Sequence, residues 1–107
     1  MEKVRKAVKA NGPAFIHVLT PCPTGWGYPE DKTIEMGRLA VESGMWYLCE
    51  YQNGKIRFTY QPEKKVPVSE YLSLQSRFRR MKPEHIAQLQ SMVDKRLAFM
   101  EALASVE

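Results

Sequence analysis

The chain has 107 residues and a formal net charge of +4 at pH 7, with 44% hydrophobic and 26% charged residues. This length fits one domain, and this balance argues against disorder and low-complexity repeats. No stretch approaches the roughly 18 apolar residues that a membrane span needs, and the charged N-terminus lacks the apolar region of a signal peptide. We therefore expect a cytoplasmic protein that does not bind a membrane.

The first part of the chain has the pattern of half an α/β unit. Residues 2–10 predict a helix, which the Asn-Gly-Pro sequence after it ends. Residues 14–20 are apolar on both faces, which is typical of a strand buried in a parallel sheet. Residues 21–29 contain three prolines and two glycines, so we expect an irregular loop. Because this loop follows the carboxyl end of the predicted strand, it lies where ligands bind in open α/β sheets.

The middle of the chain predicts a helix and a β-hairpin. Asp31 or Thr33 caps a helix that runs to about residue 43. In the segment 45–61, apolar runs flank Asn53-Gly54, which supplies the two positive φ angles of a type I′ turn. The turn residues therefore predict an antiparallel pair of strands.

The end of the chain predicts two helices. The first spans residues 68–76 with Ser69 as its cap, and Lys82-Pro83-Glu84 opens the second, which has an apolar stripe to about residue 104. We therefore expect three segments: 1–44 (helix, strand, loop, helix), 45–61 (hairpin) and 68–105 (C-terminal helices).

Positive charge is concentrated in three clusters: Lys3, Arg5, Lys6 and Lys9; Lys64 and Lys65; and Arg77, Arg79, Arg80 and Lys82. We favour the interpretation that these are solvated helix faces and turns. If they met on one face, they could bind RNA, and they could also steer an acidic protein toward a docking surface. A small basic interaction module without catalysis is therefore the alternative function.

The two cysteines, Cys22 and Cys49, form no CxxC pair, so neither a zinc site nor a thioredoxin-like motif is complete. Cys22 lies between two prolines in the predicted ligand-edge loop. Iron–sulfur clusters use cysteine thiolates, often followed by proline, although a free cysteine is commonly just a small buried apolar residue. We expect Cys49 to be structural, His17 to be a core histidine of its strand, and His85 to be solvated. No catalytic constellation is complete.

One run resembles the C-terminal part of the β subunit of pyruvate:ferredoxin oxidoreductases (pyruvate synthases): Phe15-Ile16-His17-Val18-Leu19-Thr20-Pro21-Cys22-Pro23-Thr24-Gly25-Trp26. Further matches follow in the family's order: Lys32-Thr33-Ile34-Glu35, Arg38-Leu39-Ala40-Val41-Glu42, Gly44-Met45-Trp46, Glu50-Tyr51-x-Asn53-Gly54-Lys55, Pro67-Val68-x-Glu70-Tyr71-Leu72 and Gln75-x-Arg77-Phe78-Arg79. The resemblance extends from about residue 3 to the end of the chain.

The resemblance implies an α/β fold that is the C-terminal portion of a thiamine-diphosphate-binding fold and is incomplete alone. The family oxidatively decarboxylates a 2-oxoacid, or runs in reverse, while it forms acyl-CoA and passes electrons through iron–sulfur clusters to ferredoxin. By resemblance, Cys22 is one ligand of a 4Fe-4S cluster, and Thr24, Gly25 and Trp26 line the cluster's pocket.

The same resemblance implies what this chain needs from elsewhere. Thiamine diphosphate, magnesium and the other cluster cysteines belong to segments that are absent from this sequence. The expected partners are the rest of the β subunit, subunits of the α, γ and δ type, and ferredoxin as electron partner, with no nucleic acid. No catalytic residue is expected in this chain.

Overall fold

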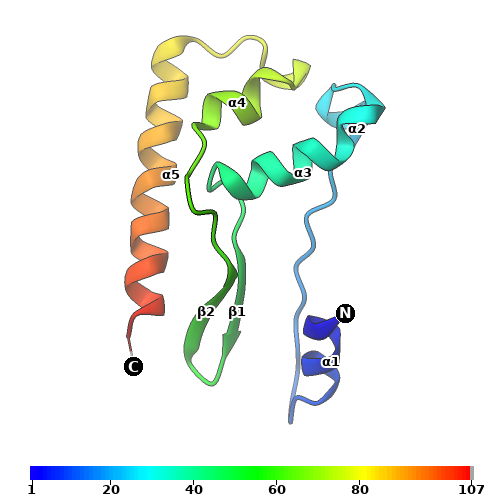
Figure 1. Ribbon diagram of the computed structural model, residues 1–107, viewed down its shortest axis with the longest axis vertical. Helices are drawn as coiled ribbons and strands as arrows, with labels where there is room; N and C mark the ends of the chain where they lie inside the picture. Colours follow the sequence, from blue (N-terminus) through cyan, green and yellow to red (C-terminus); the bar gives the residue numbers. More distant parts are fainter. Residues whose placement is uncertain (107) are drawn as a thin grey trace.

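The computed structural model describes residues 1–106 and combines helices with one pair of strands, consistent with the α/β class (Figure 1). The elements in chain order are α1 (Glu2–Val8), α2 (Pro23–Trp26), the 3-10 helix η1 (Glu30–Lys32), α3 (Thr33–Glu42), β1 (Leu48–Gln52), β2 (Lys55–Tyr60), α4 (Val68–Ser73), the 3-10 helix η2 (Ser76–Phe78) and α5 (Pro83–Ala104). None of these described helices has the length and apolar character needed to cross a membrane.

The predicted hairpin is confirmed. Strands β1 and β2 pair antiparallel, with Tyr51 opposite Ile56 and Gln52 opposite Lys55. Between them, Asn53 has a φ of 54° and Gly54 a φ of 77°, the left-handed pair that a type I′ turn requires. The turn therefore follows from the local sequence alone.

The helices α2, α3 and α4 gather at one end of the molecule, and α1 lies at the other end (Figure 1). Helix α5 runs along one side and contacts both β2 and α4. The hairpin lies between α5 and the extended segment that leads from α1 to α2. This segment, residues 9–21, is the covalent link between the two ends.

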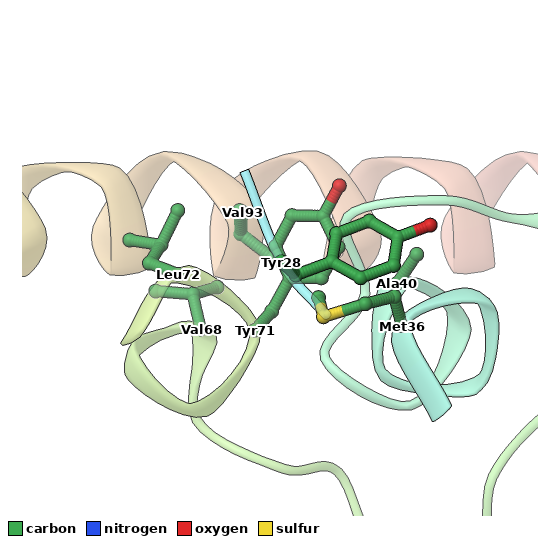
Figure 2. Close-up of a cluster of buried hydrophobic side chains, with 7 residues drawn as sticks. All are labelled: Tyr28, Met36, Ala40, Val68, Tyr71, Leu72 and Val93. Atoms are coloured by element: carbon green, nitrogen blue, oxygen red, sulfur yellow. The ribbon is translucent and has the colours of Figure 1, made fainter. Parts of the chain in front are cut away.

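The hydrophobic core lies where α3, α4 and α5 meet (Figure 2). Its members are nearly inaccessible to water: Tyr28, Met36, Ala40, Val68, Tyr71, Leu72 and Val93. The long helix α5 follows its predicted bounds, and Val93 of its apolar stripe is buried in this core. Tyr28 comes from the stretch just after α2, so the core also holds the end of the predicted loop.

The predicted strand over residues 14–20 does not form, and this expectation is wrong. The segment is not hydrogen-bonded to any other described residue, and Phe15 and Val18 are 86% and 66% exposed. A strand needs a neighbour for its backbone groups, and the two described strands pair only with each other. The apolar pattern of residues 14–20 is typical of a strand, but the pairing that would bury it is not supplied by residues 1–106.

The predicted helix caps also require correction. Thr33 is the first residue of α3, and its hydroxyl donates to the carbonyl of Glu30 at 2.8 Å, so a 3-10 turn leads into the helix. Ser69 does not cap α4, which begins at Val68 after Pro67. The Val68 amide instead donates to Oε1 of Gln90 on α5 at 2.8 Å. The cap of α4 is therefore a tertiary contact, which a search of neighbouring residues cannot find.

Lysine side chains attach α1 to the hairpin. Lys3 Nζ donates to the Cys49 carbonyl at 3.0 Å. Lys6 Nζ contacts Glu50 Oε2 at 2.8 Å, and Arg57 donates to the same oxygen at 2.9 Å. The hydrogen bond from Lys6, followed by that from Arg57, lowers the pKa of Glu50 below its ordinary value. The helix itself buries no residue, so its position depends on these polar contacts.

We expect acid to release α1 before the core unfolds. Because the folded-state pKa of Glu50 is lowered, its ion pairs stabilise the fold above the unfolded-state value of about 4.3 and are lost as pH falls through the lower folded-state pKa. In Glu50→Gln, the amides of α1 should have low protection factors (exchange rates relative to a free peptide at the same pH) already at pH 7, with little further change in the protection factors down to pH 3. Hydrogen exchange of residues 2–8 measures this.

Glu2→Gln is the matched control, because Glu2 forms only an exposed pair with Arg5 inside α1. The Glu2→Gln variant should protect α1 at pH 7 and still release it as the pH falls. If Glu50→Gln and the original chain protect α1 equally at pH 7, the attachment does not depend on this carboxylate.

Candidate functional site

The candidate site is the loop around Cys22, which contains one helical turn that the sequence did not predict. Pro23 occupies the first position of α2, where its missing amide hydrogen costs nothing. Cys22 is the N-cap, and its Sγ accepts a hydrogen bond from the Gly25 amide at 3.3 Å. The Trp26 amide donates to the Cys22 carbonyl at 2.9 Å. The expectation of an irregular loop throughout residues 21–29 is therefore wrong, because proline here begins a turn.

Gly27 ends α2 and joins the loop to η2. Its φ of 78° and ψ of 54° are left-handed, and its amide donates to the Pro23 carbonyl at 2.9 Å. Its carbonyl accepts from the Ser76 amide at 2.9 Å. A Cβ at this position would overlap the Ser76 hydroxyl. The close approach of the two segments therefore requires glycine for both its backbone angles and its small size.

Trp26 packs inward against two aromatic rings. Its ring is near-perpendicular to those of Tyr28 and Tyr71, with centroid separations of 6.1 and 6.2 Å. The guanidinium of Arg77 lies 4.4 Å from the centroid of the Trp26 ring. Cys22, Thr24 and Gly25 remain exposed. The loop thus has an anchored side and an exposed side, and the thiol is on the exposed side.

Known proteins resemble this chain over most of its length. It is 53% identical over 96 residues to the pyruvate synthase subunit PorB of Methanocaldococcus jannaschii, covering 90% of this chain and 32% of that protein. It is 53% identical over 94 residues to PorB of Methanothermobacter thermautotrophicus (88% and 33%). It is 44% identical over 108 residues to the ketoisovalerate oxidoreductase subunit VorB of Pyrococcus abyssi (99% and 35%).

This chain is homologous to the PorB and VorB subunits. The resemblance inferred from the sequence is confirmed, and the chain spans about a third of the length of these relatives. No family model matches it. The relatives are named as subunits of enzymes, so the Cys22 loop belongs to a segment homologous to part of an enzyme subunit.

The donor set of the Cys22 loop fits one ligand of an iron–sulfur cluster. The exposed thiol can be approached from outside, and the Gly25 amide already points at the sulfur. Within residues 1–106, no group of three or more His, Cys, Asp or Glu side chains could hold a metal ion. Because such clusters take four ligands, the described residues can supply one of them.

The other candidate residues lie apart from this loop. Cys49 is half-buried in β1, where a structural role was expected. His17 is exposed and stacks edge-on against Trp46 with ring centroids 4.6 Å apart. The expectation that His17 lies in the core is wrong, because the strand that would bury it does not form. His85 is exposed as predicted, and its Nδ1 accepts from the Lys82 amide at 3.4 Å.

The three basic clusters do not share one face. Lys6 of the first is paired with Glu50 on the hairpin, and Lys65 of the second is paired with Asp94 on α5. The third begins within η2, at Arg77, and continues just after it, at the end of the molecule opposite α1 (Figure 1). This separation favours solvated surfaces over a continuous nucleic-acid interface.

Sequence reasoning missed the residues that support the Cys22 loop. Ser76 and Arg77 reach it from η2, far along the chain. In the sequence, Arg77 stands out only as a member of a basic cluster. A Gln-x-Arg-Phe match to the family was its sole other signal, and that match did not indicate what the arginine contacts.

We expect Gly27→Ala to destabilise the chain and displace the Cys22 loop. The left-handed backbone and the overlap with Ser76 together predict a loss of about 2 kcal/mol or more in the free energy of unfolding. Urea unfolding of the full chain measures it. Gly12→Ala is the control, since a Cβ there meets no atom within 4 Å. Equal stability of the two variants would contradict the close approach of Gly27 to η2.

Proposed function

We propose that this chain is the C-terminal part of the β subunit of a 2-oxoacid:ferredoxin oxidoreductase, in which Cys22 is one of the four ligands of a 4Fe-4S cluster. One observation carries the proposal: an exposed thiol, which receives an amide hydrogen bond, stands on an anchored turn in a segment homologous to PorB. The names of the relatives that match at 53% favour pyruvate as the 2-oxoacid.

The local geometry suits ligation of a cluster. Hydrogen bonds from amides to ligating sulfur are one of the ways in which a protein sets the reduction potential of a cluster. The Gly25 amide occupies such a position. Pro21 and Pro23 restrict the backbone on both sides of Cys22, so the thiol needs little reorganisation on binding. Thr24 and Gly25 are exposed beside it and would face the cluster.

In the assembled enzyme, the 2-oxoacid would be decarboxylated and oxidised with formation of acyl-CoA, or the reverse, and the electrons would pass to ferredoxin. A bound cluster carries such electrons one at a time. Other parts of the β subunit would hold thiamine diphosphate and magnesium, together with the remaining cluster ligands. The described residues of this chain then hold and orient one ligand and contribute no reacting group.

Cys22→Ala should remove one 4Fe-4S cluster from the purified oxidoreductase complex that contains this chain. The expected result is a loss of that cluster's iron and of its electron paramagnetic resonance signal, while the subunit composition is retained. Cys49→Ala is the matched control, and it should leave iron unchanged because Cys49 lies in the hairpin. A full iron content in Cys22→Ala would refute the ligand assignment.

The extended segment 14–19 supports assembly with a larger partner. Its backbone groups make no hydrogen bonds with described residues, and Phe15, Ile16 and Val18 are exposed. Such a segment is a template for addition of a strand from another polypeptide. We propose that the rest of the β subunit pairs with it and completes a sheet of the thiamine-diphosphate-binding fold.

Hydrogen exchange tests this pairing. In the isolated chain, the amides of residues 14–19 should exchange at nearly the rate of a free peptide, because nothing in the chain protects them. In the assembled complex, they should exchange more than about tenfold more slowly. The hairpin amides serve as the internal control and should be protected in both samples. Unchanged exchange of residues 14–19 on assembly would rule out strand addition.

A further inference from the structure

Arg77 is held in a fixed orientation by the core. Its Nε donates to Oε1 of Gln75 at 2.7 Å. Gln75 is only 1% exposed, and its Nε2 donates to the Tyr71 carbonyl at 2.7 Å. A buried amide therefore fixes one edge of the guanidinium, although Arg77 itself belongs to an exposed turn.

The face of the same guanidinium lies against the Cys22 loop. It is 4.4 Å from the centroid of Trp26 and 4.5 Å from that of Phe78. The Trp26 amide closes the helical turn by donating to the Cys22 carbonyl. This backbone hydrogen bond, together with that from the Gly25 amide to Cys22 Sγ, links the position of Trp26 to that of Cys22.

The charge on Arg77 is not neutralised within the described chain. No carboxylate lies within ion-pair distance of it among residues 1–106, whereas Arg57, Lys6 and Lys65 each have one. The residues nearest to it in sequence that carry charge, Arg79 and Arg80, are also positive. The guanidinium carries a full positive charge, so a positive charge that is unpaired among the described residues stands beside the loop.

We propose that Arg77 is a positioning residue for the Cys22 loop: its guanidinium stacks on Trp26 to hold the turn, and its unneutralised charge raises the reduction potential of the group that Cys22 binds. The inference rests on the proposed function, because it takes that group to be an iron–sulfur cluster. A nearby positive charge favours the reduced, more negative state of a cluster.

Two substitutions separate stacking from charge. Arg77→Gln removes both the charge and the planar guanidinium group. Arg77→Lys keeps the charge but loses the planar group and its hydrogen bond to Gln75. In the cluster-containing complex, Arg77→Gln should lower the one-electron reduction potential, with a several-fold fall in the equilibrium constant for reduction. A tenfold fall would correspond to about 59 mV. Arg77→Lys should restore most of the potential, whereas a purely structural role predicts equal effects of the two variants.

Arg96→Gln is the matched control. Arg96 also stacks on an aromatic ring, with its guanidinium 5.3 Å from the centroid of Tyr47, and it also donates through Nε, here to the Tyr47 hydroxyl. It lies on α5, away from the Cys22 loop. Its loss should lower stability without changing the potential. Redox titration followed by electron paramagnetic resonance measures all three variants, with iron content measured in parallel.

A second measurement does not need the cluster. In the full chain that carries Trp46→Phe, Trp26 is the sole tryptophan. Arg77 covers one face of the Trp26 ring. Arg77→Gln should raise the quenching of Trp26 fluorescence by acrylamide, since the ring face that Arg77 covers becomes accessible to the quencher. Arg96→Gln should not change it.

The outcomes distinguish the two proposals. A complex without any Cys22-dependent cluster would refute the proposed function, and the fluorescence measurement would still decide whether Arg77 holds the loop. Unchanged quenching in Arg77→Gln would overturn the positioning role. A potential that is equal in Arg77→Gln and the original complex, at full iron content, would overturn the electrostatic role.

Discussion

The hydrogen bond from the Ser76 amide to the Gly27 carbonyl is the contact on which the candidate site depends. At 2.9 Å it joins the loop after residues 14–20 to the turn after α4. Helix α4 is fixed in turn, because Val68 and Leu72 are buried between α3 and α5. The exposed Cys22 is therefore supported by the most deeply packed part of the described chain. Sites are more accurately preorganised when a rigid element holds them from behind.

The two ends of the molecule are stabilised by different forces. At the α2 end, burial of apolar side chains dominates (Figure 2). At the α1 end, the helix buries no residue and is attached through Lys3 and Lys6. Since burial contributes most to stability and exposed ion pairs contribute little, the α1 end should open first. Between the ends, residues 14–19 make no hydrogen bonds with other described residues, so a strand added there would order both ends together.

Local signals predicted the elements whose causes are local. Asn53-Gly54 determines the hairpin turn, and Pro83 marks the start of α5. The predictions that fail concern features whose cause lies far away along the chain or outside it. Residues 14–20 have the pattern of a strand, but a strand is a property of a pair. The cap of α4 comes from Gln90 on α5. In the candidate site, Cys22 followed from sequence and resemblance, whereas the contact of Arg77 with Trp26 exists only in the folded chain.

The distribution of burial within the loop supports the proposal that Cys22 binds a group shared between polypeptide segments. Cys22, Thr24 and Gly25 are exposed, whereas Trp26 is half-buried and Tyr28 is 6% exposed. A purely structural cysteine would gain stability by facing the core, as small apolar residues do. Here the core side is taken by Trp26 and Tyr28, and Cys22 remains exposed. If Cys22 is one cluster ligand of four, as proposed, it has to face outward, because the other three would approach from outside.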